Sequence, residues 1–253
     1  MRKEALSSPF PKYARIYPWI LLAIFFILAT TSLIQKSATY DESYNLGVGY
    51  YLLTHGDRNI PDGGLHPPLS SIIHGLPLFL TEIPESIWKE PLAHVRGQKL
   101  IDLRDDDWIL NASRLAVVLI GVALGWLVFS WSRRLYGKGG GILSLALYCF
   151  SPNILAHARL ITPDMTLIFT TVLSAYWLWR FMEDPEKRCL LAAGLSLGLL
   201  LYSKYTALLL IPILMLTDVA CRYKSKGLTW RRPRCLLKAV SYTHLTLPTK
   251  RIV

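Results

Sequence analysis

Long apolar blocks, separated by short polar stretches, dominate the pattern of this chain. A helix needs about 20 apolar residues to cross the hydrocarbon core of a bilayer, and it satisfies its own backbone hydrogen bonds there. The blocks therefore predict an all-α integral membrane protein with about six transmembrane helices. The expected spans cover residues 17–34, 114–131, 140–157, 163–181, 189–203 and 205–220, of which the last two are short.

The longest polar segment, residues 35–113, follows the first span and is too long for a structureless connection. Thr39 and Glu42 form the T-x-x-E pattern of a helix capping box, and apolar residues then recur at helical spacing. This pattern predicts a short amphipathic helix over residues 40–54, lying on the membrane surface. A second short helix is expected after the double proline, in the segment "LSSIIHGL".

The net charge of +11 is distributed as a membrane topology requires rather than as a nucleic-acid surface. From Arg222 onward there are nine Lys or Arg residues and no Asp or Glu, and further basic residues follow the second and fourth spans. Counted across the spans, these residues lie on one side, which the positive-inside rule makes cytoplasmic. The loop 35–113, with eleven acids against six Lys or Arg, then lies outside the cytoplasm. It contains no cysteine, so neither a disulfide framework nor a metal–thiolate site is expected.

The last segment, "SYTHLTLPTKRIV", differs abruptly from the sequence before it and has no apolar periodicity. It resembles a translated adapter tail, so residues 241–253 are interpreted as non-native. Residues 1–240 are then expected to be the N-terminal part of a longer multi-span membrane domain.

Acidic residues occur where the expected spans emerge on the outer side. Asp41 and Glu42 open the first loop helix, where a carboxylate could accept a proton, although both also favour a helix N-terminus. In "ARLITPDMTL", Arg159 and Asp164 lie at the same outer face, and Thr162 is the expected helix cap. Acids near an arginine suit a hydroxyl acceptor and an anionic headgroup.

Two further cationic candidates lie on the outer side. His66 in "LHPPL" precedes two prolines that fix its backbone, and a histidine there could bind a phosphate or a metal. Lys204 interrupts apolar sequence between the last two spans, where it could contact a phosphate or extend its amine to the membrane interface.

The order of these motifs resembles the dolichyl-phosphate-mannose-protein mannosyltransferase family. The motifs are "DE" after the first span, "HPPL", R-x-x-x-x-D before a later span, and "GLxLGLLxxSKYTALLLIP". The resemblance covers about residues 15–220 and includes bacterial relatives of the glycosyltransferase C class, such as the lipid A aminoarabinose transferases. It implies an enzyme of the bacterial inner membrane, active on the extracytoplasmic side. Such an enzyme transfers a sugar, with inversion, from a polyprenyl-phosphate donor to a hydroxyl on a protein or lipid acceptor.

The resemblance also implies roles for single residues. Asp41 matches the proposed catalytic base, Glu42 is its neighbour, and Asp164 matches the second outer acid. His66, Arg159 and Lys204 match contacts to the donor phosphate. A divalent metal is left open as a cofactor, although Leu65 stands where the aminoarabinose transferases have an acidic residue.

Two other functional classes are left open by the residues themselves. A multi-span transporter or lipid flippase would also carry acids near its spans, but such proteins usually show repeated halves, and this chain has none. A noncatalytic membrane assembly subunit would not depend on Asp41. Lipid is the expected environment in all three readings, and no nucleic-acid partner is expected.

Overall fold

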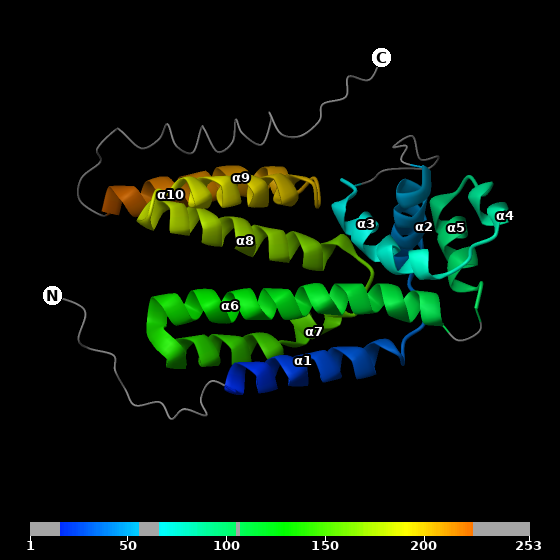
Figure 1. Cartoon of the computed structure of the whole chain (residues 1–253), viewed down its shortest axis with the longest axis horizontal. Helices are drawn as coiled ribbons and strands as arrows, with labels where there is room; N and C mark the ends of the chain where they lie inside the picture. The colour runs from blue at the N-terminus through cyan, green and yellow to red at the C-terminus, as the bar shows by residue number, and fades with distance from the viewer. Residues whose placement is uncertain (1–15, 56–65, 105–106, 225–253) are drawn as a thin grey trace, which may run out of the picture. The chain divides into compact units, whose positions relative to one another are not determined.

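The computed structural model describes residues 16–55, 66–104 and 107–224, and these residues form helices without any strand. In chain order the helices are α1 Tyr17–Leu33, α2 Tyr40–His55, α3 Leu69–Gly75, the 3-10 helix η2 Leu76–Leu80, α4 Glu85–Trp88, α5 Ala93–Ile101, α6 Trp108–Cys149, α7 Pro152–Ala158, α8 Pro163–Glu183, α9 Lys187–Leu201 and α10 Ala207–Lys224. The all-α prediction is therefore confirmed, and every expected span contains a helix (Figure 1). The segment interpreted as an adapter tail, 241–253, lies outside the described residues.

The chain divides into two compact units, which are described separately. The first comprises residues up to 64 together with 71–165, and the second comprises residues 65–70 together with the chain from 166 onward. The first unit contains α1, α2, α5, α6 and α7, and the second contains α9, α10 and most of α8.

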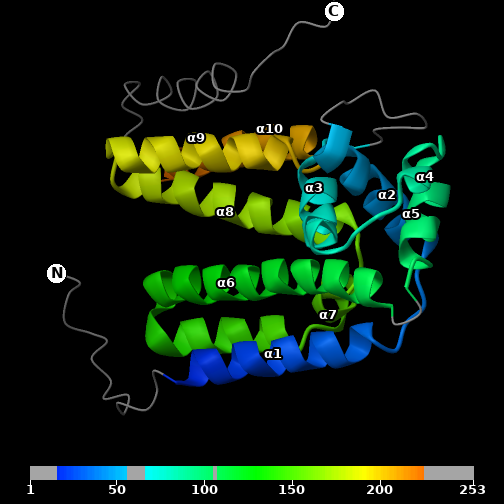
Figure 2. The same ribbon diagram turned by 45° about the vertical axis from the view of Figure 1, so that its right-hand side comes forward.

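Helix α6 is a hairpin of two helical arms. Gly137 has φ 77° and ψ −174°, a backbone conformation that interrupts the helix and that glycine adopts without strain. The hydroxyl of Tyr148 donates a hydrogen bond to the carbonyl oxygen of Gly121 at 2.6 Å, so the second arm runs back along the first. Figures 1 and 2 both show this reversal.

The expected span 140–157 is not one helix. Its residues divide between the end of α6 at Cys149 and the separate helix α7, which starts at Pro152. Proline disfavours helical backbone in the residue before it, and Ser151 accordingly is extended, with φ −71° and ψ 117°.

By length and composition, one helix among the described residues, α6, is apolar enough to cross a membrane, with a mean hydropathy of 2.2 over its best stretch. The apolar helices Tyr17–Leu33, Leu69–Leu80 and Ala207–Leu216 are shorter. The number of about six spans therefore stays a prediction.

Helices α1 and α6 pack closely through two glycines that form a G-x-x-x-G pattern on α6. A Cβ at Gly121 would lie 3.0 Å from the ring of Phe25, and one at Gly125 would lie 2.9 Å from Leu22. Small residues at this spacing let apolar helices approach each other closely in a membrane. The adjacent rings of Trp19 and Trp126 stack at 4.7 Å between centroids.

Helix α2 confirms the expected helix over 40–54, but it is not amphipathic as expected. Its buried residues are Glu42, Ser43, Asn45, Leu46, Gly47, Val48, Gly49 and Tyr50, which surround the helix axis.

Two glycines explain this burial of α2 on more than one side. A Cβ at Gly47 would lie 2.0 Å from the carbonyl oxygen of Ala93 in α5, and one at Gly49 would lie 1.9 Å from that of Ser71 in α3. Helix α2 is thus enclosed by backbone on both sides, and it forms a core with Leu78, Leu100, Ile109 and Ile161.

Candidate active site

The first turn of α2 contains a buried ion pair between Glu42 and Arg114. The Arg114 Nε donates to Glu42 Oε1 at 2.7 Å and its Nη2 donates to Oε2 at 2.8 Å. Both side chains are 0% exposed. Arg114 also donates to the carbonyl oxygens of Leu33, Lys36 and Ser37, at 2.8, 2.7 and 2.9 Å. One guanidinium therefore joins the end of α1, the link to α2 and the first turn of α2.

Glu42 accepts further hydrogen bonds from two other segments. The backbone N–H and hydroxyl of Thr39 donate to Oε2 at 2.9 and 3.1 Å, and the first of these bonds is the Glu42 half of the expected capping box. The backbone N–H of Ile161 donates to Oε1 at 3.1 Å. Burial raises the pKa of Glu42, but the hydrogen bonds from Arg114, Thr39 and Ile161 and the Arg114 charge outweigh it and lower that pKa below its usual value. Glu42 is thus an ionised structural acceptor.

Asp41 lies next to Glu42 in the chain but has the opposite environment, because its side chain is exposed. Its backbone carbonyl accepts a hydrogen bond from Asn45 Nδ2 at 2.7 Å, and the same Nδ2 donates to the carbonyl oxygen of Ile161 at 3.1 Å. Asn45 and Glu42 together hold the start of α2 against the link between α7 and α8. Asp41 is therefore an accessible carboxylate on a rigidly anchored turn.

Asp164 lies in the first turn of α8, where a carboxylate interacts favourably with the helix dipole. Its Oδ2 is 3.8 Å from Nδ1 of His157, and the two side chains are 34% and 48% exposed. The hydroxyl of Thr162, expected to cap this helix, is buried and makes no hydrogen bond. Glu42 and Asn45 both bind Ile161, in the link that follows Arg159 and precedes α8, the helix that carries Asp164. That Asp41 and Asp164 converge on one face stays a prediction.

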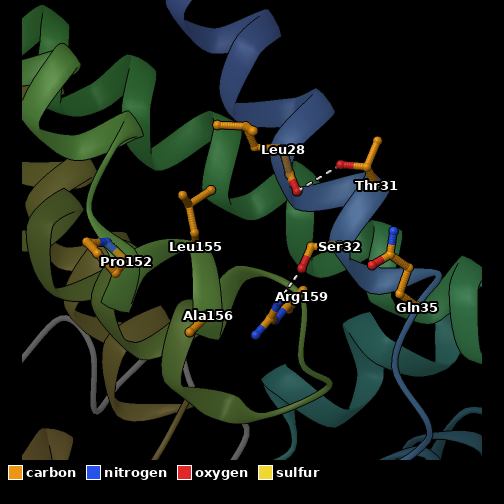
Figure 3. Close-up of a pocket in the computed structure, with 8 residues that line it drawn as sticks. All are labelled: Leu28, Thr31, Ser32, Gln35, Pro152, Leu155, Ala156 and Arg159. Atoms are coloured by element: carbon orange, nitrogen blue, oxygen red, sulfur yellow. Dashed lines mark hydrogen bonds between the residues drawn. The ribbon is translucent and has the colours of Figure 1, made fainter.

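Arg159 follows α7 and lines a pocket between α7 and α1 (Figure 3). Its Nη1 donates to the hydroxyl of Ser32, and no carboxylate among the described residues lies within ion-pair distance of it. The pocket has a volume of about 380 Å³. Its lining consists of Leu28, Thr31, Ser32, Gln35, Pro152, Leu155, Ala156 and Arg159.

His66 and Lys204 belong to the second unit, where both side chains are half-buried. The segment after His66 is bound to the turn that carries Lys204. The backbone N–H of Leu69 donates to the carbonyl oxygen of Tyr202 at 3.1 Å, and the hydroxyl of Ser70 donates to the carbonyl oxygen of Ser203 at 3.3 Å. The two expected phosphate contacts thus lie on two segments that are hydrogen-bonded to each other.

Sequence reasoning missed Arg114 and Asn45, which organise the first unit. Arg114 is the first residue of the expected second span, and an ionisable side chain at that position calls for a buried partner. This reasoning predicts that Arg114 has a partner but not which residue it is, because Glu42 lies 72 residues away in the chain.

The donor set of the described residues does not favour a metal site. No three His, Cys, Asp or Glu side chains among them lie close enough together to hold a metal ion. His157 and Asp164 form only a pair. The proposed reaction below therefore uses no metal-dependent step.

Comparison with known proteins identifies the family. Residues 107–239, just over half of the chain, match the family described as dolichyl-phosphate-mannose-protein mannosyltransferase. The chain belongs to this family, which confirms the resemblance found in its motifs, and it is in general terms a membrane-associated glycosyltransferase. No curated protein and no solved structure matches the chain.

Proposed function

We propose that the chain is a membrane glycosyltransferase that takes its sugar from a polyprenyl-phosphate carrier and acts in protein or lipid glycosylation. The acceptor is a hydroxyl on an extracytoplasmic protein or lipid. The observation that carries the proposal is the contrast in the "DE" motif, where Glu42 is held by Arg114 and Asp41 is exposed beside it. Family membership supports the general reaction class.

Asp41 is the proposed general base. Its carboxylate accepts the proton of the acceptor hydroxyl while that oxygen bonds to the anomeric carbon of the sugar. The bond from this carbon to the carrier phosphate oxygen breaks, and its electron pair leaves with the polyprenyl phosphate. One displacement of this kind inverts the anomeric configuration. The exposure of this carboxylate and the hydrogen bond that holds its backbone support this role, because a general base must reach the proton that it accepts.

Glu42 was expected to share the catalytic role, but its surroundings support a positioning role. Both of its oxygens accept hydrogen bonds from inside the protein, so a reacting hydroxyl would have to displace Arg114, Thr39 or Ile161. Glu42 thus fixes the turn on which Asp41 is presented. Asp164, partly exposed on the segment that Glu42 binds, is the proposed second acid and contacts the acceptor or the sugar.

His66 and Lys204 are the proposed contacts to the carrier phosphate. As the phosphate leaves, its negative charge grows, and cationic or N–H donors already in position stabilise that charge most effectively. The hydrogen bonds from the His66 segment to the Lys204 turn support a common role for these two residues. Arg159 was expected as a third contact, which stays a prediction. It lines a pocket with residues of α1 and α7, and that pocket is considered separately below.

The proposed location is a bacterial plasma membrane with the site on the extracytoplasmic side. Nucleotide sugars are cytoplasmic, so a site on the far side needs a lipid-borne donor. The test compares labelled sugar presented on polyprenyl phosphate with the same sugar on a nucleoside diphosphate. Transfer from the lipid donor alone, with an inverted anomeric configuration in the product, is expected. Transfer from the nucleotide donor, or retention of configuration, would contradict the proposal.

A further inference from the structure

The pocket between α1 and α7 combines an apolar wall with a cation that has no acidic partner among the described residues. Arg159 is half-buried there, and it donates a hydrogen bond to the neutral hydroxyl of Ser32. A guanidinium in a partly enclosed site is stabilised by an anion that can accept two parallel hydrogen bonds, and phosphate oxygens have this geometry. The charge of the pocket therefore points to an anionic ligand.

The polar side chains gather at the end of the pocket where α1 stops. Ser32 lies beside Arg159, and Gln35 contributes an exposed amide just beyond the helix (Figure 3). Thr31 already donates its hydroxyl to the carbonyl of Ile27 at 2.7 Å, so it adds mainly an acceptor. A phosphate at this end would find the guanidinium and the Gln35 amide as donors.

The rest of the pocket is apolar and continues onto the exposed surface of α1. Leu28, Pro152, Leu155 and Ala156 form this wall. The neighbouring Ile27 is 56% exposed and belongs to the expected first span. A ligand that fits both parts needs an anionic head and a hydrocarbon chain.

We propose that this pocket binds the headgroup phosphate of an anionic glycerophospholipid, with an acyl chain along α1, and that this lipid does not react. The proposal goes beyond sugar transfer and does not depend on it. The pocket lining includes no Asp or Glu, so a headgroup ammonium would find no partner there, and anionic lipids are favoured over zwitterionic ones. For the same reason a sugar phosphate in this pocket would lack a base.

The experiment measures lipid binding to the full chain in a neutral detergent by native mass spectrometry, with phosphatidylglycerol and phosphatidylcholine as probes. Phosphatidylglycerol is expected to bind about tenfold or more tightly than phosphatidylcholine. Arg159→Gln should reduce phosphatidylglycerol binding by about tenfold or more, because hydrogen bonds to charged groups are the strong ones. Leu155→Trp, which keeps the cation but fills the apolar wall, should reduce it similarly. It serves as the second variant if Arg159→Gln does not fold.

Lys36→Gln is the matched control, because Lys36 is exposed one residue beyond Gln35 and does not line the pocket. Lys36→Gln should bind phosphatidylglycerol as tightly as the unmodified protein does. If it loses as much affinity as Arg159→Gln, the effect is a general one of charge, and the pocket assignment is overturned. If inorganic phosphate displaces phosphatidylglycerol when the two are present at similar concentrations, the lipid assignment is overturned. Stronger Arg159-dependent binding of polyprenyl phosphate than of phosphatidylglycerol would make the pocket a donor site and overturn the assignment to a non-reacting lipid.

Discussion

Arg114 holds both carboxylate oxygens of Glu42, at 2.7 and 2.8 Å, in a site from which solvent is fully excluded. Arg114 belongs to α6 and Glu42 to α2, and the two residues lie 72 positions apart in the chain. Because Arg114 also binds three backbone carbonyls, the pair fastens the link between α1 and α2. The position of Asp41, one residue before Glu42, therefore depends on a contact deep inside the first unit.

Removing one partner of this pair should strongly destabilise the protein. Glu42→Gln and Arg114→Met each leave an uncompensated buried group, for which about 3–5 kcal/mol is typical. Thermal unfolding in detergent measures the effect. The control is Lys99→Gln, which breaks the exposed pair of Lys99 with Glu90 and should cost less than about 1 kcal/mol. Equal effects of the buried and exposed changes would contradict the structural role of Glu42.

The close approach of α2 to its neighbours predicts which glycines tolerate a methyl group. Gly47→Ala and Gly49→Ala would each place a Cβ about 2 Å from a backbone oxygen, and overpacking of this kind typically costs 1–3 kcal/mol or more. Gly198→Ala in α9 is the matched control, since no atom lies within 4 Å of its added Cβ, and it should stabilise by about 0.5–1 kcal/mol. Unfolding temperatures that fall equally for all three variants would be inconsistent with this packing.

Stability should fall as the pH drops below 6.5, because of His74. This residue of α3 is 0% exposed, and neither of its ring nitrogens has a hydrogen-bond partner. Burial lowers its pKa to about 3, against the opposing charge of Glu42. As the pH falls, His74 therefore takes up a proton in the unfolded chain before it does so in the folded one. The free energy of unfolding decreases by about 1.4 kcal/mol per pH unit from pH 6.5 down to about 3. His74→Leu should remove this dependence between pH 6.5 and 5, where the Glu42 carboxylate is ionised. If the free energy of unfolding of the variant depends on pH as steeply as that of the unmodified protein, the dependence comes from groups other than His74.

The proposed topology can be tested by cysteine labelling in a background without the four native cysteines. Asp41→Cys should react with a membrane-impermeant reagent added from outside, because the basic residues after the second and fourth expected spans place the loop 35–113 on the opposite, extracytoplasmic side. Arg134→Cys, on the exposed surface near the α6 reversal, should react only after the membrane is permeabilised. The reverse pattern would move the site to the cytoplasm and remove the need for a lipid-borne donor.

Much of the helix order could be predicted from the sequence, because apolar blocks and proline or glycine signals are local. The expected spans 17–34, 163–181 and 189–203 correspond to α1, α8 and α9 within a few residues. The break before Pro152 was missed because the surrounding sequence is apolar enough to continue a helix. The enclosure of α2 was missed because a glycine carries no hydrophobic signal, yet it admits a neighbouring backbone.

The candidate site was only partly predictable, for a different reason. Asp41 and Glu42 are adjacent and chemically similar, and no local pattern tells which is buried. The distinction comes from Arg114 and Ile161, which reach Glu42 from distant parts of the chain. The pocket at Arg159 likewise needs α1 and α7 side by side, which periodicity within either helix does not reveal.

The role of Asp41 as general base is tested most directly by the transfer rate of Asp41→Asn compared with that of the unmodified enzyme. Folding of both proteins is checked by their unfolding temperatures. Asparagine tolerates the first turn of a helix, and loss of the dipole contact costs only about 0.3–1 kcal/mol. Loss of a general base instead lowers the rate by about 10²–10⁴. If Asp41 is the general base, the variant folds normally and its transfer from the polyprenyl-phosphate donor is reduced to that extent. A normally folded variant that keeps near-full transfer would contradict this role.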